Sequence, residues 1–132
     1  MPTVRLQSAG SQAVAKAAVN YFGTTPGLAA NSTAFFPLNG LETPGLPNLT
    51  WIVVQTGGAA GATVTPQVSL RRGDTQGGVA AQFFIDIGAP ALLVPNVSTV
   101  FEFNAPVQAM RLKIVTPNQA STTCQVALLA SG

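Results

Sequence analysis

The side chains that most often carry out chemistry are scarce in this sequence. It contains one cysteine, no histidine, and four carboxylates, which are Glu42, Asp74, Asp86 and Glu102. Without histidine there is no imidazole base for a serine hydrolase triad and no Cys/His zinc site. A single cysteine cannot form a disulfide within one chain, and the alternating apolar stretch around Cys124 favours a buried, inert thiol.

The four carboxylates do not form a recognisable catalytic or metal-binding pattern. Hydrolysis by carboxylates needs two of them facing each other across a cleft. Asp86 and Glu102 lie in predicted strands and could be neighbours, but the ordinary interpretation is two charges that face solvent. Calcium binding through Asp74 or Asp86 and loop carbonyls is conceivable, although no dense aspartate cluster is present. We therefore predict a protein that is not an enzyme and that holds no cofactor or metal.

Two loops resemble binding motifs. The glycine-rich segment 56–63 lacks the Gly-Lys-Ser/Thr ending of a phosphate loop and lies between predicted strands, so we expect a flexible strand connection. Arg71 and Arg72 are the one adjacent pair of basic residues, and with Gly73 and Asp74 they predict a charged hairpin turn. A contact with an acidic partner surface is the functional alternative for this arginine pair.

The composition narrows the class of protein further. Charged residues make up 8% of the 132 residues, against about 25% in an ordinary soluble domain. A hydrophobic content of 47% argues against disorder, and the net charge of +2 without a basic cluster argues against nucleic-acid binding. The apolar runs are far shorter than the roughly 20 residues of a membrane-spanning helix, and the first residues lack the apolar segment of a signal peptide. Low surface charge promotes association, which suits a protein that works within an assembly.

Prolines and glycines interrupt the chain at short intervals, and the stretches between them are rich in Val, Ile, Thr and Phe. This pattern is typical of a sandwich or barrel of short strands. The predicted strands span 49–56, 64–70, 81–87, 97–103, 107–116 and 122–129. We predict an all-β fold, an antiparallel, jelly-roll-like β-sandwich of about eight strands that forms a single domain over residues 1–132.

Residue alternation assigns faces to several strands. Both faces of 49–56 are apolar, which predicts a central strand buried on both sides. Pro66 cannot donate to a ladder, which predicts an edge strand or a bulge. In 107–116, the apolar side chains at 110, 112 and 114 are predicted to face the core, and Arg111 and Lys113 to face solvent. Replacing either basic residue with serine should then change stability by about 0.5 kcal/mol or less.

The N-terminal third has a weaker pattern. Residues 3–7 are compatible with a strand, and the alanine-rich segment 12–19 with a helix or, as we prefer, a strand. Phe35 and Phe36 form a bulky pair that we expect in the core or at an interface. Residues 1–45 are considered as a possible N-terminal extension or arm that makes oligomer or capsid contacts.

Four segments within residues 51–129 carry a family likeness. They are Val68-Ser-Leu-Arg-Arg-Gly-Asp74, Phe84-Ile-Asp-Ile-Gly88, Val100-Phe-Glu-Phe103 and Ala105-Pro-Val-Gln-Ala-Met-Arg-Leu-Lys-Ile-Val115. With these segments, residues 51–129 resemble small β-sandwich structural proteins of tailed bacteriophages. The same arrangement is similar to discoidin-like and carbohydrate-binding sandwiches. The chain departs from carbohydrate modules because Tyr21 and Trp51 are its only Tyr and Trp, and Trp51 is expected in the core.

Among phage proteins, the resemblance implies a capsid decoration (cement) protein that stabilises the head shell by bridging subunits of the major capsid protein. It would form a homodimer or homotrimer on the outer capsid surface of the virion after synthesis in the host cytoplasm, without nucleic-acid or membrane partners. The candidate interface residues are Phe35, Phe36, Arg71 and Arg72. The alternatives are a head-tail or tail protein of a phage and a carbohydrate-binding module.

Overall fold

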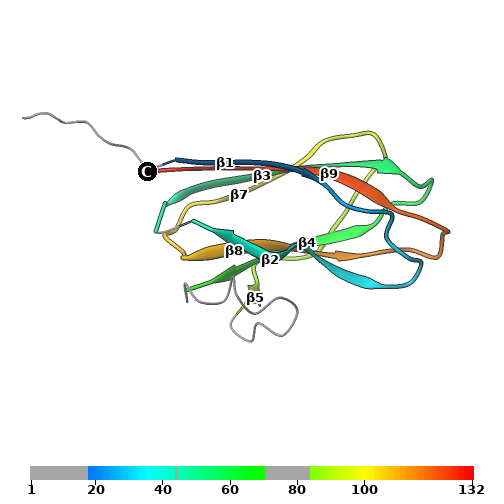
Figure 1. Ribbon diagram of the computed structural model, residues 1–132, viewed down its shortest axis with the longest axis horizontal. Helices are drawn as coiled ribbons and strands as arrows, with labels where there is room; N and C mark the ends of the chain where they lie inside the picture. The colour runs from blue at the N-terminus through cyan, green and yellow to red at the C-terminus, as the bar shows by residue number, and fades with distance from the viewer. Residues whose placement is uncertain (1–17, 44, 71–83) are drawn as a thin grey trace, which may run out of the picture.

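The structure is a computed structural model, which describes residues 18–43, 45–70 and 84–132 of the chain. These residues form nine strands and no helix. The strands form two antiparallel sheets that lie face to face (Figure 1). They are β1 (Ala18–Thr24), β2 (Thr33–Glu42), β3 (Asn48–Gly57), β4 (Thr63–Ser69), β5 (Ile85–Asp86), β6 (Ala91–Leu92), β7 (Thr99–Phe103), β8 (Ala109–Val115) and β9 (Thr123–Ser131).

The strand order is that of a jelly roll. One sheet has the order β1-β9-β3-β7, and the other has the order β2-β8-β4 with both β5 and β6 paired to the far side of β4. Strands pair from the chain ends inward, β1 with β9, β2 with β8, β3 with β7, and β4 with β5 and β6. The chain is therefore one long antiparallel hairpin wrapped into a sandwich, and the predicted fold class is confirmed. The two-residue strands β5 and β6 share a single edge position, so eight strand positions are filled.

The core lies between the two sheets and is built from alternate residues of the long strands. The predicted inward face of β8 and the predicted burial of Cys124 on β9 are confirmed, because each of these side chains is at most 1% exposed. β3 supplies the largest buried side chain, Trp51, which is 1% exposed. The buried core side chains of these three strands are Leu49, Trp51, Val53, Met110, Leu112, Ile114, Cys124, Val126 and Leu128.

β3 is central, as predicted, but the expectation that both of its faces are buried is wrong. Its inward side chains Leu49, Trp51 and Val53 are at most 1% exposed, whereas its outward side chains Ile52 and Val54 are half-buried. The reason is that each sheet of a two-layer sandwich has one face on the core and one on the outside. The apolar side chains on the outward face of β3 are therefore not part of the core between the sheets.

Pro66 is neither in an edge strand nor at a bulge. β4 pairs with β8 without a register shift, and Pro66 lies opposite Leu112. On its other side, β4 pairs with β6 at residues 63–64 and with β5 at residues 67–68, so Pro66 falls in the interval between these two short strands. The Pro66 carbonyl accepts a hydrogen bond from the Ile87 N–H on that side. In an antiparallel strand, the N–H and C=O groups of one residue point toward the same neighbouring strand. The missing N–H of Pro66 therefore faces the interval between β6 and β5, where the ladder of hydrogen bonds is interrupted.

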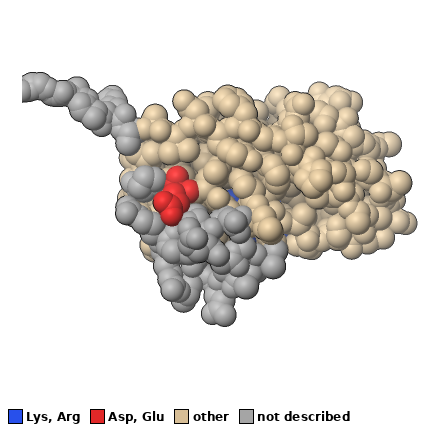
Figure 2. All heavy atoms as spheres, viewed as in Figure 1, with Lys and Arg blue, Asp and Glu red and all other residues tan. Residues whose placement is uncertain are grey.

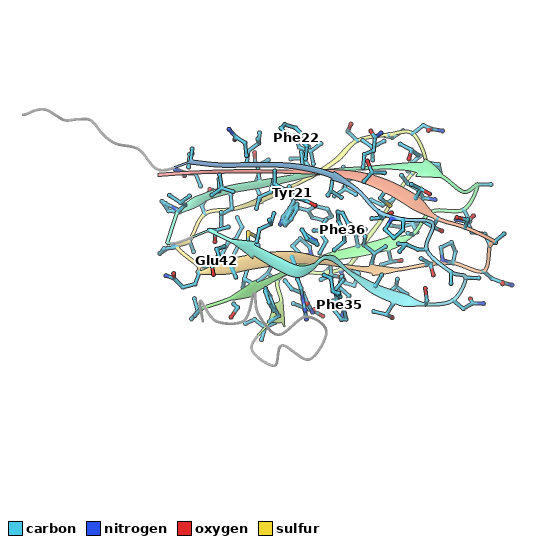
Figure 3. All side chains as sticks on the ribbon, viewed as in Figure 1. Tyr21, Phe22, Phe35, Phe36 and Glu42 are labelled. Carbon is cyan, nitrogen blue, oxygen red and sulfur yellow. The ribbon has the colours of Figure 1, made fainter. Side chains whose placement is uncertain are left out.

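The N-terminal third contributes one strand to each sheet. β1 contains the last two residues of the predicted strand 12–19, and residues 1–17 lie outside the described part of the chain. Residues 18–42, which the sequence groups with a possible extension, form the edge strands β1 and β2. The aromatic rings of Tyr21 on β1 and Phe36 on β2 meet between the sheets, with their centroids 6.4 Å apart (Figure 3).

Candidate functional site

The outward face of β8 carries Arg111 and Lys113, as predicted, but Arg111 does not face solvent. It is 3% exposed, and its guanidinium lies between two aromatic rings. The guanidinium carbon is 4.1 Å from the centroid of Phe35 on β2 and 4.2 Å from that of Phe84, which precedes β5. The prediction of a solvated arginine is wrong because alternation specifies the outward direction but not what covers that face.

A chain of hydrogen bonds connects Arg111 to the surface. Its Nε donates to Gln67 Oε1 over 2.7 Å, and Gln67 Nε2 donates to Asp86 Oδ1 over 2.8 Å. Lys113 Nζ completes the chain with an ion pair to Asp86 Oδ2 at 2.8 Å. The hydrogen bonds from Lys113 and Gln67 hold the pKa of Asp86 below its ordinary value. The Arg111 cluster, defined as Arg111, Phe35, Phe84, Gln67, Asp86 and Lys113, is therefore a satisfied structural network.

The carboxylate pair that the sequence left open does not form. Asp86 lies on the outward face of one sheet, where it binds Lys113, and Glu102 lies on the outward face of the other sheet. Across the described residues, no group of three His, Cys, Asp or Glu side chains could hold a metal ion. The same part of the chain contains no helix with the length and hydropathy needed to cross a membrane.

The glycine-rich connection between β3 and β4 uses its backbone groups internally. The buried Gln55 side chain accepts a hydrogen bond from the Ala62 N–H and donates to the Ala60 carbonyl, with distances of 2.8 and 2.7 Å. The Gln119 side chain accepts from the Ala60 N–H over 2.8 Å and donates to its carbonyl over 3.0 Å. This segment is the strand connection that the sequence predicts, and two glutamine side chains organise it.

The outward face of the β1-β9-β3-β7 sheet has a different character. The register places Phe22, Ala127, Ile52 and Val100 side by side across all four strands. Phe22 is 75% exposed and Val100 is 54% exposed. Glu102 is the one charged side chain that the described strands place on this face. We call this row of four residues the apolar row.

Figure 3 shows the Phe22 side chain pointing away from the sandwich, while the adjacent Tyr21 points between the sheets. The side of the molecule along β1 and β2 has few charged side chains (Figure 2). A large exposed aromatic ring on an apolar row is a common mark of an interaction surface. The apolar row is the best candidate for a functional surface among the described residues.

Sequence reasoning chose other residues for this role. Phe36 packs against the core, and Phe35 stacks on Arg111, so both aromatic rings have contacts within the chain. Arg71 and Arg72 lie outside the described residues. The available signal for Phe22 was its alternation with Tyr21, but alternation alone does not tell which of two aromatic neighbours faces the core.

A second feature is a cleft of about 300 Å³ between the sheets, at the edge opposite β1 and β2. Its walls are mainly apolar. One sheet contributes Trp51, Phe101 and Phe103, and the other contributes Pro66 and Met110. Residues 87–89 and Glu102 complete the lining.

Comparisons with known proteins identify similar folds but no family for this chain. No protein-family model matches the sequence, and no curated protein matches it. A chain of Bacillus endospore appendages, reported to form a family of disulfide-linked pili, matches with a TM-score of 0.53 and 13% identity over 98% of this chain and 96% of that chain.

Two further solved structures match with lower scores. A chain of infectious bursal disease virus, Gx strain, gives a TM-score of 0.48 and 15% identity over 99% of this chain, which spans 37% of that chain. The mitogen derived from Yersinia pseudotuberculosis gives a TM-score of 0.46 and 11% identity over 86% of each chain. At such an identity, the endospore appendage match shows a shared fold alone.

Proposed function

We propose that this chain is a structural subunit that acts by non-covalent assembly and carries out no catalysis. The observation that carries the proposal is the apolar row, because it leaves Phe22 and Val100 exposed on an otherwise regular sheet face. Burying a side chain of this size contributes about 1.5–3 kcal/mol, so the row can supply a useful part of an interface. The match to a chain of disulfide-linked pili supports a structural role.

The cysteine content distinguishes this assembly from the disulfide-linked pili that share the fold. The sequence has a single cysteine, and one disulfide per chain can join two copies but cannot propagate a polymer. Cys124 is also 0% exposed on the inward face of β9, and burial raises its pKa to about 11. A thiol in this state is a poor nucleophile for disulfide exchange at neutral pH. Contacts between subunits are therefore expected to be non-covalent.

In its specific form, the proposal is a decoration protein on the outer surface of a phage capsid, made in the host cytoplasm and bound to the major capsid protein. It is supported by the resemblance of residues 51–129 to phage structural sandwiches and by the jelly-roll order, an architecture used in viral capsids. A head-tail or tail protein of a phage is the nearest alternative. Repeated weak contacts on a symmetric shell would add through avidity.

A carbohydrate-binding role is less well supported. Jelly rolls also occur in lectins, which commonly stack sugars on exposed aromatic rings. Here Trp51 is 1% exposed in the core, and Tyr21 is half-buried and faces between the sheets. Of the aromatic side chains that the structure describes, Phe22 is the one with a largely exposed ring.

The experiment measures mass by light scattering over a range of concentrations for the wild-type protein and for Phe22→Ser. The wild type is expected to form dimers or trimers, and Phe22→Ser to shift toward monomer. Phe35→Ser is the matched control, because its ring contacts Arg111 within the chain and its loss should weaken folding more than assembly. A wild-type protein that stays monomeric at high concentration and does not bind capsids lacking it would contradict the proposal.

A further inference from the structure

The edges of the two sheets differ in how they are protected. Unpaired backbone groups at a sheet edge tend to bind another strand, and a proline, a bulge, a charge or a very short strand discourages this. β2 contains Pro37 and shifts its register with β8 between Phe36 and Leu41. β7 carries Glu102, and β5 and β6 are two residues each. Each of these edges therefore has a feature that opposes pairing.

The edge strand β1 has none of these features. Its sequence, AVNYFGT, contains no proline and no charge, and its seven residues pair with β9 without a register shift. Among the described residues, no strand pairs with its other side. β1 is therefore an edge at which a further strand can add to the sheet.

The hydrogen bonds of β1 indicate which of its residues face the open side. The N–H of Thr25, which directly follows β1, donates to the Cys124 carbonyl over 2.8 Å and so faces β9. In an antiparallel strand, both backbone groups of one residue point to the same neighbour, and the direction alternates along the strand. The N–H and C=O groups that point to the open side therefore belong to Ala18, Asn20, Phe22 and Thr24. The side chains of the same residues are exposed on the outward face.

We propose that β1 pairs antiparallel with β1 of a second copy of this chain, about a two-fold axis at Phe22, so that the two four-stranded sheets become one. This inference rests on the proposed function and names the partner and the contact. An antiparallel pair of identical strands makes an isologous contact, which closes at a dimer and does not propagate. Assembly through β1 therefore gives a homodimer.

The register follows from the side chains on the outward face. With the axis at Phe22, its ring lies opposite the same ring of the second copy, and the apolar row continues from one chain into the other. Asn20 then lies opposite Thr24 of the second copy, so polar side chains also meet each other. An axis at Tyr21 would instead set the Asn20 amide against the Phe22 ring. This self-complementarity favours a second copy over an unrelated strand as the occupant of the edge.

The inward face of β1 is compatible with the same register. The Tyr21 ring lies over Gly23 of its own strand, where a Cβ atom would collide with the ring. In the dimer, Tyr21 lies opposite Gly23 of the second copy, which has no side chain to displace the ring. The pairing therefore leaves the contact between Tyr21 and Phe36 in place.

Asn20→Pro tests the edge, because it removes an N–H on the open side and leaves the hydrogen bonds between β1 and β9 intact. Light scattering is expected to give the mass of a dimer for the wild type. The dissociation constant of the dimer should rise about ten-fold or more in Asn20→Pro, with an unchanged circular dichroism spectrum. Asn20→Ala is the matched control, because it keeps the N–H and should remain dimeric.

The outcomes separate this inference from the proposed function. If Phe22→Ser dissociates the wild-type dimer but Asn20→Pro leaves it intact, assembly uses the apolar row without pairing of β1, and the inference alone is overturned. A wild-type trimer, or a monomer that binds capsids, would likewise overturn the inference alone. A wild-type monomer that does not bind capsids would contradict both.

Engineered disulfides give a test that does not depend on a proline. In the proposed register, position 20 lies opposite position 24 of the second copy, with Cα atoms about 5.5 Å apart, which a disulfide can span. Within one chain the two positions are about 13 Å apart, which is too far. The native Cys124 is 0% exposed and does not compete.

Asn20→Cys combined with Thr24→Cys should therefore give a covalent dimer on oxidation, seen on a non-reducing gel. Asn20→Cys alone should stay monomeric on the same gel, because the two copies of position 20 lie far apart in this register. Equal cross-linking of the two variants, or polymers in place of a dimer, would refute the pairing.

Discussion

The outward face of the β2-β8-β4 sheet is polar and closed, whereas the outward face of the β1-β9-β3-β7 sheet is apolar and open. On the first face, Gln67 and Arg111 are 7% and 3% exposed and bind each other. On the second face, Phe22 and Val100 are 75% and 54% exposed. The residue types are thus the reverse of what a simple rule of polar outside and apolar inside would give.

The two faces differ in whether their contacts come from within the chain or from another molecule. Buried polar groups are stable when they are hydrogen-bonded, and the Arg111 cluster supplies those bonds from within the chain. An exposed apolar row lowers its free energy only by contact with another molecule. The first face therefore stabilises the fold, and the second is available for assembly.

The largest expected effect tests the assignment of the two faces of β8. Leu112→Asp places an unpaired charge at a position that is 0% exposed, at a cost comparable with the whole stability of a small domain. We expect no folded protein by circular dichroism. Val115→Asp on the same strand, where the side chain is 40% exposed, should fold. A folded Leu112→Asp protein would mean that the faces of β8 are exchanged. The contrast between the closed face and the open face would then be wrong.

The next effect measures the closed face. Arg111→Ala removes two ring contacts and the hydrogen bond to Gln67, so the free energy of unfolding should fall by about 3 kcal/mol in urea denaturation. Lys113→Ala, which removes an ion pair with partly exposed side chains, should cost about 1 kcal/mol or less. Equal losses for the two variants would show that burial does not distinguish Arg111 from Lys113.

A smaller effect appears on acidification. The pKa of Asp86 is lowered in the folded state, so the unfolded chain binds a proton more tightly. The stabilisation is therefore complete above the unfolded-state pKa near 3.8 and is lost as the pH falls through the lower, folded-state pKa. Because the Asp86 side chain is 45% exposed, its share is below about 1 kcal/mol. Asp86→Asn should flatten this part of the acid denaturation profile, and an unchanged profile would argue against the ion pair.

The smallest effect on folding is expected on the open face. Val100→Ser should change the free energy of unfolding of the dissociated protein by about 0.5 kcal/mol or less, because the side chain is 54% exposed. Val53→Ser is the same substitution at a 0% exposed position of the paired strand, and it should cost several times more. If thermal denaturation gave similar losses for both, Val100 would be covered within the chain and the face would not be open.

Much of the fold could be predicted from the sequence because strand alternation is a local property. The inward residues of β8 and the burial of Cys124 on β9 were predicted correctly, and so was the antiparallel jelly-roll sandwich. The function of individual outward residues was harder to predict. Phe35 and Phe36 were expected as interface candidates, yet their rings contact Arg111 and Tyr21 within the chain.

By itself, the sequence determined the fold class, the inward face of β8 and the lack of histidine-based chemistry, because composition and period-two alternation are readable without contacts. Only the tertiary structure decided that Arg111 is enclosed, that Phe22 is exposed and that a cleft lies beside Trp51. Each of these depends on which strands become neighbours. β2 and β8, or β3 and β7, are distant in the sequence and are brought together by the wrapping of the jelly roll.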